Sequence, residues 1–278
     1  MHDHPKALLE QFGYRPKKRL GQNFLMDAGA AARIAQLVVD DPPEGGSFRV
    51  LEIGPGTGAL TQALVHAHTD VSALDVDPDM VRILRSRDEL RRANILQADA
   101  LTFDYDAFAG GAEWRVTGNL PYNIATPLIM RFIEMHNGPQ RLVVMVQKEV
   151  ADRLAAKPAT PAYGSLSVAV QYAMRVEKAF TLKPGAFYPR PKIDSTVVRL
   201  TRLSAPAVDV GNEHRFLQVV RAAFAYRRKT LANSLALAIG VPRMQVARAL
   251  EQIGLDTEIR GEQLALNDFA RLTDHLPA

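Results

Sequence analysis

The sequence predicts an α/β fold with a mostly parallel sheet covered by helices on both faces, followed by a small all-α domain. Short β-rich runs alternate with helical stretches between residues 48 and 146, whereas the last third of the chain shows helical patterns alone. Repeated alternation of this kind indicates βαβ units, whose strands run parallel. With 278 residues, 47% of them hydrophobic, the chain has enough apolar material for a large domain and a small one.

The predicted elements follow the chain in order. A helix at 28–39 precedes five strands, at 48–53, 71–76, 95–97, 114–117 and 142–146. Two more β-like runs, 179–182 and 195–200, flank a proline-rich stretch, as an antiparallel pair at the sheet edge would. A linker at 204–211 leads to helices at 213–225, 230–239, 243–253 and 268–276. We therefore expect a basic N-terminal arm at 1–27, a larger domain at 28–204 and a helical domain at 212–278.

The composition excludes several classes of site. The chain has no cysteine, which removes disulfides, thiolate zinc sites and cysteine nucleophiles and favours a cytoplasmic location. No stretch approaches the roughly 20 apolar residues of a membrane span, so no membrane association is expected. None of the seven histidines falls in a motif, so a metal-free site is expected. The net charge of +4 and the pI of about 9.4 suit a polyanionic partner but do not require one.

A glycine-rich turn follows the first predicted strand. The run Glu52-Ile53-Gly54-Pro55-Gly56-Thr57-Gly58 enters a helix, and its glycines allow a tight turn and close approach to a ligand. Gly54, Gly56 and Ala59 also satisfy the dinucleotide fingerprint, so a nicotinamide-dependent oxidoreductase is an alternative. However, Glu52 before the glycines, Asp75 after the second strand and Asp99 after the third resemble the class I S-adenosylmethionine methyltransferases, which have a Rossmann-like sheet. That resemblance implies that Asp75 binds the ribose hydroxyls and Asp99 the adenine amine.

The fourth strand ends in Asn119-Leu120-Pro121-Tyr122, at the sheet edge where open α/β sheets bind ligands. An adenine amine is a weak nucleophile because its lone pair is delocalised into the ring. The Asn119 side-chain oxygen and the carbonyl of Leu120 or Pro121 could accept its two hydrogens, and Tyr122 could stack on the base. A turn that merely begins the next helix is the structural alternative. The tetrapeptide resembles that of adenine-N6 methyltransferases.

From about Lys17 to the C-terminus, the chain resembles the small-subunit ribosomal RNA adenine dimethyltransferases, the kasugamycin-sensitivity methyltransferase family. Motifs in family order carry the resemblance, at residues 17–25, 146–154, 163–167, 187–195 and 225–231. The resemblance implies S-adenosyl-L-methionine as cofactor, bound by Asn23, Leu25, Glu52, Gly54, Gly56, Asp75, Asp99 and Asn119. It also implies a catalytic set of Asn119, Leu120, Pro121, Tyr122 and Phe187, in which Tyr122 and Phe187 hold the two faces of the base. One departure concerns Asp75, because glutamate is usual there in the family.

The family resemblance further implies a substrate. It predicts N6,N6-dimethylation of two adjacent adenosines near the 3′ end of 16S ribosomal RNA within a pre-30S particle, by a monomer that takes part in rRNA processing and ribosome biogenesis. Basic residues expected to contact the RNA are Lys17, Lys18, Arg19, Arg190, Lys192, Arg227, Arg228 and Lys229. The nearest alternative is large-subunit adenine methylation of the macrolide-resistance type. A role in ribosome assembly or transcription without catalysis is another.

Overall fold

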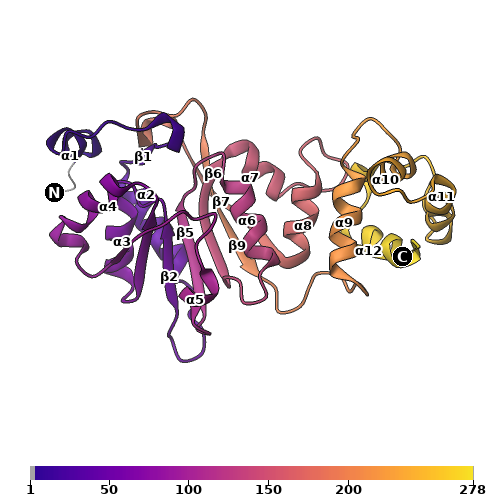
Figure 1. The fold of residues 1–278 in the computed structure, drawn as a ribbon, viewed down its shortest axis with the longest axis horizontal. Helices are drawn as coiled ribbons and strands as arrows, with labels where there is room; N and C mark the ends of the chain where they lie inside the picture. The colour runs from indigo at the N-terminus through magenta and orange to yellow at the C-terminus, as the bar shows by residue number, and fades with distance from the viewer. Residues whose placement is uncertain (1–3, 278) are drawn as a thin grey trace. The chain divides into compact units, whose positions relative to one another are not determined.

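A seven-stranded sheet forms the centre of the larger of the chain's two units (Figure 1). The structure, a computed structural model, describes residues 4–277, apart from the side chain of Lys18. The larger unit comprises residues 4–151 and 177–202, and the smaller unit comprises 152–176 and 203–277. Residues 152–176, which the sequence assigned to the larger domain, thus group with the C-terminal helices.

The sheet has the strand order β4-β3-β2-β5-β6-β9-β7. Its first five strands are parallel, and β9 runs antiparallel to β6, which confirms the predicted mostly parallel α/β sheet. The chain moves outward in one direction from β2 to β4 and in the other from β5, so strand order reverses between β2 and β5. The strands are β2 (Arg49–Ile53), β3 (Val71–Asp75), β4 (Asn94–Gln97), β5 (Trp114–Asn119), β6 (Arg141–Gln147), β7 (Met174–Leu182) and β9 (Ser195–Arg202).

Apolar stripes on the helices explain how they cover the sheet. α2 (Ala28–Val39) buries Ala31, Ile34 and Val38 in one cluster with α3 (Ala59–Ala67) and with the side chains of Val50 and Val143 from the sheet. A separate group of aromatic rings from α5 (Tyr105–Ala109), β5 and α6 (Ala125–Glu134) packs around Trp114, Phe132 and Tyr105. The remaining helices of this part are α4 (Pro78–Arg85), η2 (Asp88–Leu90) and α7 (Lys148–Leu154).

The N-terminal segment has more structure than its sequence indicated. It contains α1 (Pro5–Gln11), η1 (Lys18–Leu20) and a two-residue strand, β1 (Phe24–Leu25), although no helix was expected before residue 28. α1 forms because Leu8 and Leu9 are buried, 5% and 1% exposed, against Met80 and Ile83 of α4. β1 pairs antiparallel with β8 (Phe187–Tyr188), which follows η3 (Pro184–Ala186). Pairing between such short and distant segments leaves no periodic signal in the sequence.

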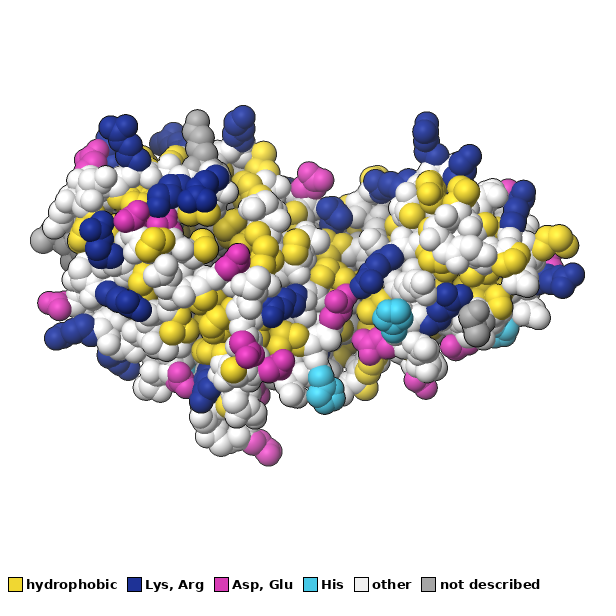
Figure 2. Space-filling model, in the orientation of Figure 1, with side chains coloured by type: hydrophobic (Ala, Val, Ile, Leu, Met, Phe, Trp, Pro, Cys, Tyr) yellow, Lys and Arg dark blue, Asp and Glu magenta, His cyan; other side chains and the backbone are white. Residues whose placement is uncertain are grey.

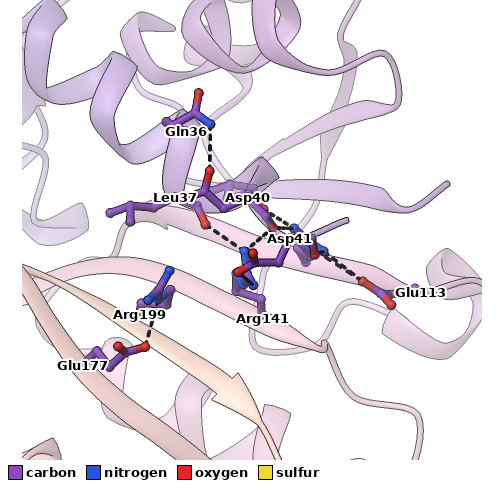
Figure 3. A network of polar contacts seen from close by, with 10 residues as sticks. Gln36, Leu37, Asp40, Asp41, Glu113, Arg141, Glu177 and Arg199 are labelled. Atoms are coloured by element: carbon purple, nitrogen blue, oxygen red, sulfur yellow. Dashed lines mark hydrogen bonds and ion pairs between the residues drawn. The ribbon is translucent and has the colours of Figure 1, made fainter. Parts of the chain in front are cut away.

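Two buried arginines hold the C-terminal end of α2 (Figure 3). The Arg115 guanidinium donates to the carbonyls of Val38 at 2.6 Å, Asp40 at 2.7 Å and Asp41 at 2.6 Å. Arg141 donates to the Leu37 and Asp40 carbonyls and lies 3.2 Å from the Asp41 carboxylate. The last carbonyls of a helix lack partners within it, so these arginines satisfy them and complement the helix dipole.

The smaller unit is all-α, as predicted. Tyr172 packs on Phe216 with ring centroids 4.8 Å apart, and the Tyr163 hydroxyl donates to the Leu264 carbonyl at 2.9 Å. Its helices are α8 (Ser165–Ala173), α9 (Glu213–Ala223), α10 (Leu231–Ile239), α11 (Arg243–Gln252), η4 (Gly261–Gln263) and α12 (Leu266–His275). Within residues 4–277, no helix combines the length and the apolar character needed to cross a bilayer.

Replacing Arg115 with Met should lower the free energy of unfolding by about 3 kcal/mol, because it leaves the Val38 and Asp41 carbonyls without their charged donor, while Arg141 still donates to the Asp40 carbonyl. Arg199→Met is the matched control: Arg199 is 23% exposed and pairs with Glu177 at 3.0 Å (Figure 3). Such a partly exposed ion pair contributes less than about 1 kcal/mol. Urea denaturation of both variants measures the difference, and equal losses would contradict the structural role given to Arg115.

Candidate functional site

A cavity of about 380 Å³ opens at the carboxyl ends of the parallel strands of the larger unit. Its wall combines the turn after β2, the ends of β3 and β5, the segment after β4 and residues 19–25. This is the edge at which open α/β sheets bind ligands, beside the point where strand order reverses. The cavity wall includes most of the predicted site residues: Asn23, Leu25, Glu52, Gly54, Gly56, Asp75, Asp99, Asn119, Leu120, Pro121 and Tyr122.

Glycines allow the backbone to approach its neighbours closely around the cavity. Gly54 and Gly56 have φ angles of +68° and +56°, and a Cβ on Gly56 would lie 2.6 Å from the Phe24 ring. The N-terminal arm can therefore pack on this turn only because position 56 has no side chain. Gly118, which the sequence analysis did not single out, is equally constrained: its φ is +149°, and a Cβ there would lie 2.2 Å from the Ile53 carbonyl oxygen.

Two carboxyl groups lie on the floor of the cavity. Glu52 is 1% exposed, and burial raises its pKa to about 8 although the Thr61 hydroxyl donates to its carboxylate at 2.6 Å. Asp75 is 9% exposed, and burial raises its pKa to about 6 although backbone N–H groups, that of Asp77 at 2.8 Å among them, donate to it. Both side chains are therefore prepared for partners that donate hydrogen bonds or carry positive charge.

Two exposed apolar side chains belong to the same cavity wall as these acids. Val76 and Leu101 are 47% and 41% exposed, and both line the cavity. Asp99, which also lines the cavity, is exposed and accepts the Leu101 N–H through one carboxylate oxygen at 2.8 Å. Val76 and Leu101 were not predicted as site residues. Their positions in the sequence could have indicated them, because Val76 directly follows Asp75 and Leu101 comes two residues after Asp99, each beyond the end of a strand.

Asn119 is held in one orientation. Its side-chain nitrogen donates to the backbone carbonyl of Asn23 at 2.8 Å. A carbonyl only accepts hydrogen bonds, so the amide nitrogen must face it, and the Asn119 Oδ1 atom is left as an acceptor at the cavity wall. The arm is fixed at this point too, because the Asn23 side chain donates to the Gly21 carbonyl at 3.0 Å.

The two carbonyls that follow Asn119 differ in their partners. The Pro121 carbonyl accepts the N–H groups of Ile124 and Ala125, both at 3.0 Å, and so begins α6. For the Leu120 carbonyl, the part of the chain that the structure describes offers no donor. From the sequence, either carbonyl could be the second acceptor for a bound amine. The Leu120 carbonyl is the better candidate, because the Pro121 carbonyl already accepts two backbone N–H groups.

Phe187 does not lie where the sequence predicted. It is 1% exposed, pairs with Leu25 across β1 and β8, and belongs to the apolar cluster beneath the arm rather than to the cavity wall. Because the Phe187 ring is buried in this cluster, it does not line the cavity. In this structure Phe187 therefore supports the arm, whereas Tyr122 is half-buried in the wall.

The side chain of Asp77 fastens the arm to the sheet. It is fully buried and accepts from the Tyr14 hydroxyl at 2.6 Å and the Lys17 ammonium at 2.8 Å. Gln22 adds a weaker bond to Asp77 at 3.4 Å. Burial alone would raise the pKa of Asp77, but the hydrogen bonds from Lys17 and Tyr14 outweigh it and lower the pKa. Asp77 is thus the centre of a buried network, which we call the Asp77 clasp.

The predicted RNA-contacting cations have different surroundings. Lys17 is engaged by Asp77 and by Asp79, 3.0 Å away, so its charge is neutralised within the protein instead of being offered to phosphate. The side chain of Lys18 lies outside the described residues. The others are exposed: Arg19 at the cavity, Arg190 and Lys192 after β8, and Arg227, Arg228 and Lys229 in the smaller unit. Figure 2 shows Lys and Arg side chains spread over the visible face rather than gathered in one stripe.

In the described part of the chain, no group of three or more His, Cys, Asp or Glu side chains could hold a metal ion. The polar groups around the cavity are carboxylates, side-chain amides and backbone carbonyls. They suit an organic ligand that carries hydroxyl and amine groups.

The Asp77 clasp predicts how the arm opens. Asp77→Asn keeps a side chain that can begin α4 but removes the charge that Lys17 and Tyr14 bind. Trypsin cleavage after the basic residues at 17–19 should become at least about tenfold faster, since cleavage follows the population of the opened arm. Asp79→Asn is the control. The Asp79 carboxylate is 42% exposed, so its ion pair with Lys17 contributes little, and this variant should leave the cleavage rate nearly unchanged. Equal rates in both variants would show that Asp77 does not hold the arm.

Comparisons with known proteins agree with this geometry. The family profile described as "Ribosomal RNA adenine dimethylase" matches residues 13–276. "Ribosomal RNA small subunit methyltransferase A" of Geobacter metallireducens is 43% identical over 267 residues, covering 94% of this chain and 95% of that protein. The protein of the same name from Streptococcus thermophilus is 41% identical and covers 98% and 95% of the two chains.

Solved structures show the same likeness. A dimethyladenosine transferase from Plasmodium falciparum superposes with a TM-score of 0.74 at 25% identity, covering 90% of this chain and 95% of that one. The 23S rRNA methyltransferase ErmE gives a TM-score of 0.67 at 25% identity and covers 91% and 99%. With the family profile spanning nearly the whole length and relatives above 40% identity, the chain belongs to the ribosomal RNA adenine dimethylase family.

Proposed function

We propose that this chain transfers methyl groups from S-adenosylmethionine to the N6 amine of two adjacent adenosines near the 3′ end of small-subunit ribosomal RNA, two per base. The observation that carries the chemistry is the fixed Asn119 amide, whose Oδ1 atom faces the cavity at the end of β5. The choice of RNA follows the relatives, which are named as small-subunit methyltransferases. A large-subunit substrate, as in the name of ErmE, is the alternative, and its supporting likeness is lower.

The residues of the cavity fit the parts of the cofactor. The Asp75 carboxylate can accept from two neighbouring ribose hydroxyls, and the free oxygen of Asp99 can accept from the adenine amine. Val76 and Leu101 would cover the two sides of the adenine ring. The methionine end would lie along Gly54 and Gly56, near the buried Glu52 and below Asn23 and Leu25. When bound, S-adenosylmethionine supplies an electrophilic methyl group on a sulfonium.

The target amine is held by two acceptors. The Asn119 Oδ1 atom and the Leu120 carbonyl would each accept one of its hydrogens, which draws the nitrogen lone pair out of the ring and toward the methyl group. Transfer forms the new N–C bond as the C–S bond breaks, and the extra proton on nitrogen is released afterwards to water. The tetrapeptide offers the amine an amide oxygen and backbone carbonyls as acceptors, so positioning is the main contribution of the protein.

The base must leave its stack before it reaches this site, at a cost of a few kcal/mol. Tyr122 would recover part of that cost by stacking, worth about 1–3 kcal/mol per base. Exposed cations would bind phosphates of the RNA: Arg19, Arg190 and Lys192 on the larger unit, and Arg227, Arg228 and Lys229 on the smaller. The partner we propose is a pre-30S particle in the cytoplasm, bound by a monomer.

Replacing Asn119 with Ala should reduce methyl transfer to undermethylated small subunits by at least about a hundredfold, because one of two acceptors for the reacting amine is lost. Affinity for S-adenosylhomocysteine should change by less than about threefold: the family resemblance also implies a cofactor contact of Asn119, but Asp75 and Asp99 would hold the ribose and adenine groups. Asn123→Ala, an exposed neighbour in the same wall, is the control and should keep most activity. Parallel loss of transfer and cofactor binding in Asn119→Ala would assign Asn119 to the cofactor instead.

Cofactor affinity should depend on pH through Asp75. Its pKa is raised to about 6 in the free protein, and the ribose hydroxyls bind the ionised carboxylate better, so binding lowers the pKa. Affinity for S-adenosylhomocysteine should therefore rise from pH 5 to pH 7, approaching about tenfold per unit below the free pKa. Asp75→Asn should bind weakly and lose the part of the rise near pH 6. Calorimetric titration at several pH values measures both, and an identical pH profile in the two proteins would contradict this role of Asp75.

A further inference from the structure

The loop after β4 forms the adenine side of the cavity, and internal hydrogen bonds give it a tight turn. The N–H groups of Thr102 and Phe103 donate to the Asp99 carbonyl at 3.1 Å and 2.9 Å. The Asp99 side chain accepts the Leu101 N–H at 2.8 Å, which leaves its other oxygen for a ligand. The position of that oxygen therefore depends on the conformation of residues 99–103.

An arginine outside the cavity binds this loop from behind. The Arg131 guanidinium donates to the carbonyls of Ala100 at 3.2 Å, Leu101 at 2.8 Å and Phe103 at 2.7 Å. It also lies over the Tyr105 ring, 4.7 Å from the centroid, and the Tyr105 hydroxyl donates to the Ala100 carbonyl at 2.7 Å. A planar fork with five donors can bind three carbonyls at once, which a lysine ammonium on a flexible stem cannot reproduce.

Arg131 belongs to the element that begins at the catalytic tetrapeptide. It lies on α6, Ala125–Glu134, whose first N–H groups are bound by the Pro121 carbonyl. Much of α6 is buried, with Leu128, Ile129 and Phe132 fully covered, so the helix is a rigid support. Arg131 thus joins the loop that carries Asp99 to the helix that directly follows Asn119 and Tyr122.

We propose that Arg131 is a positioning residue that sets the adenine selectivity of the cofactor site, by tying the loop at 99–103 to the helix that follows the catalytic tetrapeptide. Arg131 does not line the cavity, so it acts through Asp99 and Leu101 rather than on the cofactor itself. The inference rests on the proposed function, in which Asp99 accepts the adenine amine. Its loss should affect cofactor recognition more than the transfer step, because Asn119 is fixed separately by the Asn23 carbonyl.

The test compares two ligands of the free protein by calorimetric titration: S-adenosylhomocysteine and S-inosylhomocysteine, in which a carbonyl replaces the adenine amine. In Arg131→Met, affinity for the adenine ligand should fall about tenfold and preference over the inosine ligand should shrink by a similar factor, since a misplaced acceptor no longer finds the amine. The turnover number at saturating S-adenosylmethionine should change by less than about threefold. Arg131→Lys should lie between Met and the native protein.

Controls separate positioning from general damage. Arg92→Met, at an exposed position of the same unit, should leave affinity and selectivity unchanged. Tyr105→Phe removes only the hydroxyl bond to Ala100 and gives a milder variant that should lose selectivity in the same direction. Native selectivity in a folded Arg131→Met protein, judged by its unfolding midpoint, would overturn the proposal.

A third variant, Asp99→Ala, separates the role of Arg131 from the role that the proposed function gives to Asp99. If it reduces the preference for adenine, Arg131→Met added to it should cause no further loss of selectivity, and an additional loss would overturn the proposal. If Asp99→Ala keeps the preference, the role given to Asp99 in the proposed function is wrong. The role of Arg131 is then tested by the affinity of Arg131→Met for S-adenosylhomocysteine alone. An affinity lower than that of Arg92→Met supports the proposal that Arg131 positions the loop, and an equal affinity overturns it.

Discussion

The hydrogen bond from the Asn119 amide to the Asn23 carbonyl joins two parts of the chain that are 96 residues apart in sequence. One is the end of a central strand, and the other is the N-terminal arm. A side-chain amide can rotate to present either its oxygen or its nitrogen to a ligand, and a partner that is strictly an acceptor fixes the nitrogen toward itself and the oxygen away. The arm supplies this partner, so the oxygen that we propose as acceptor for the target amine is oriented only when the arm is in place.

Other features of the larger unit keep the arm in place. Gly56 lacks a side chain where the Phe24 ring packs, β1 pairs with β8, and the Asp77 clasp binds the segment just before these contacts. α2 begins directly after the arm, with Asp27 accepting the Ala30 N–H, and its other end is held by Arg115 and Arg141. Asp75, the acid that we propose for the cofactor ribose, lies two residues from Asp77 in the same turn. The position of this acid and the orientation of the Asn119 amide thus depend on one connected set of contacts.

Much of this arrangement could be predicted from the sequence. Alternating β and helical patterns gave the parallel sheet, and strand ends placed the glycine turn, Asp75, Asp99 and the tetrapeptide around one cavity. These features could be predicted because they follow local periodicity and the rule that parallel strands end together.

Features that depend on contacts between distant segments could not be predicted. The pairing of Phe24 and Leu25 with β8 buries Phe187, which the sequence placed against the base. The acid at position 77 looks like any loop aspartate until Tyr14 and Lys17 are seen beside it, and Lys17 then ceases to be a free cation. Likewise, the helix Ser165–Ala173 has the same sequence pattern whichever unit it joins, and only packing such as that of Tyr172 on Phe216 decides the unit.

The most direct test of the choice of RNA uses the intact protein and S-adenosylmethionine with a labelled methyl group. Transfer is measured to undermethylated small subunits, large subunits and free RNA, and the labelled nucleoside is then identified. The account predicts label in small subunits as N6,N6-dimethyladenosine. Label in large-subunit RNA, or in a nucleoside other than adenosine, would contradict it.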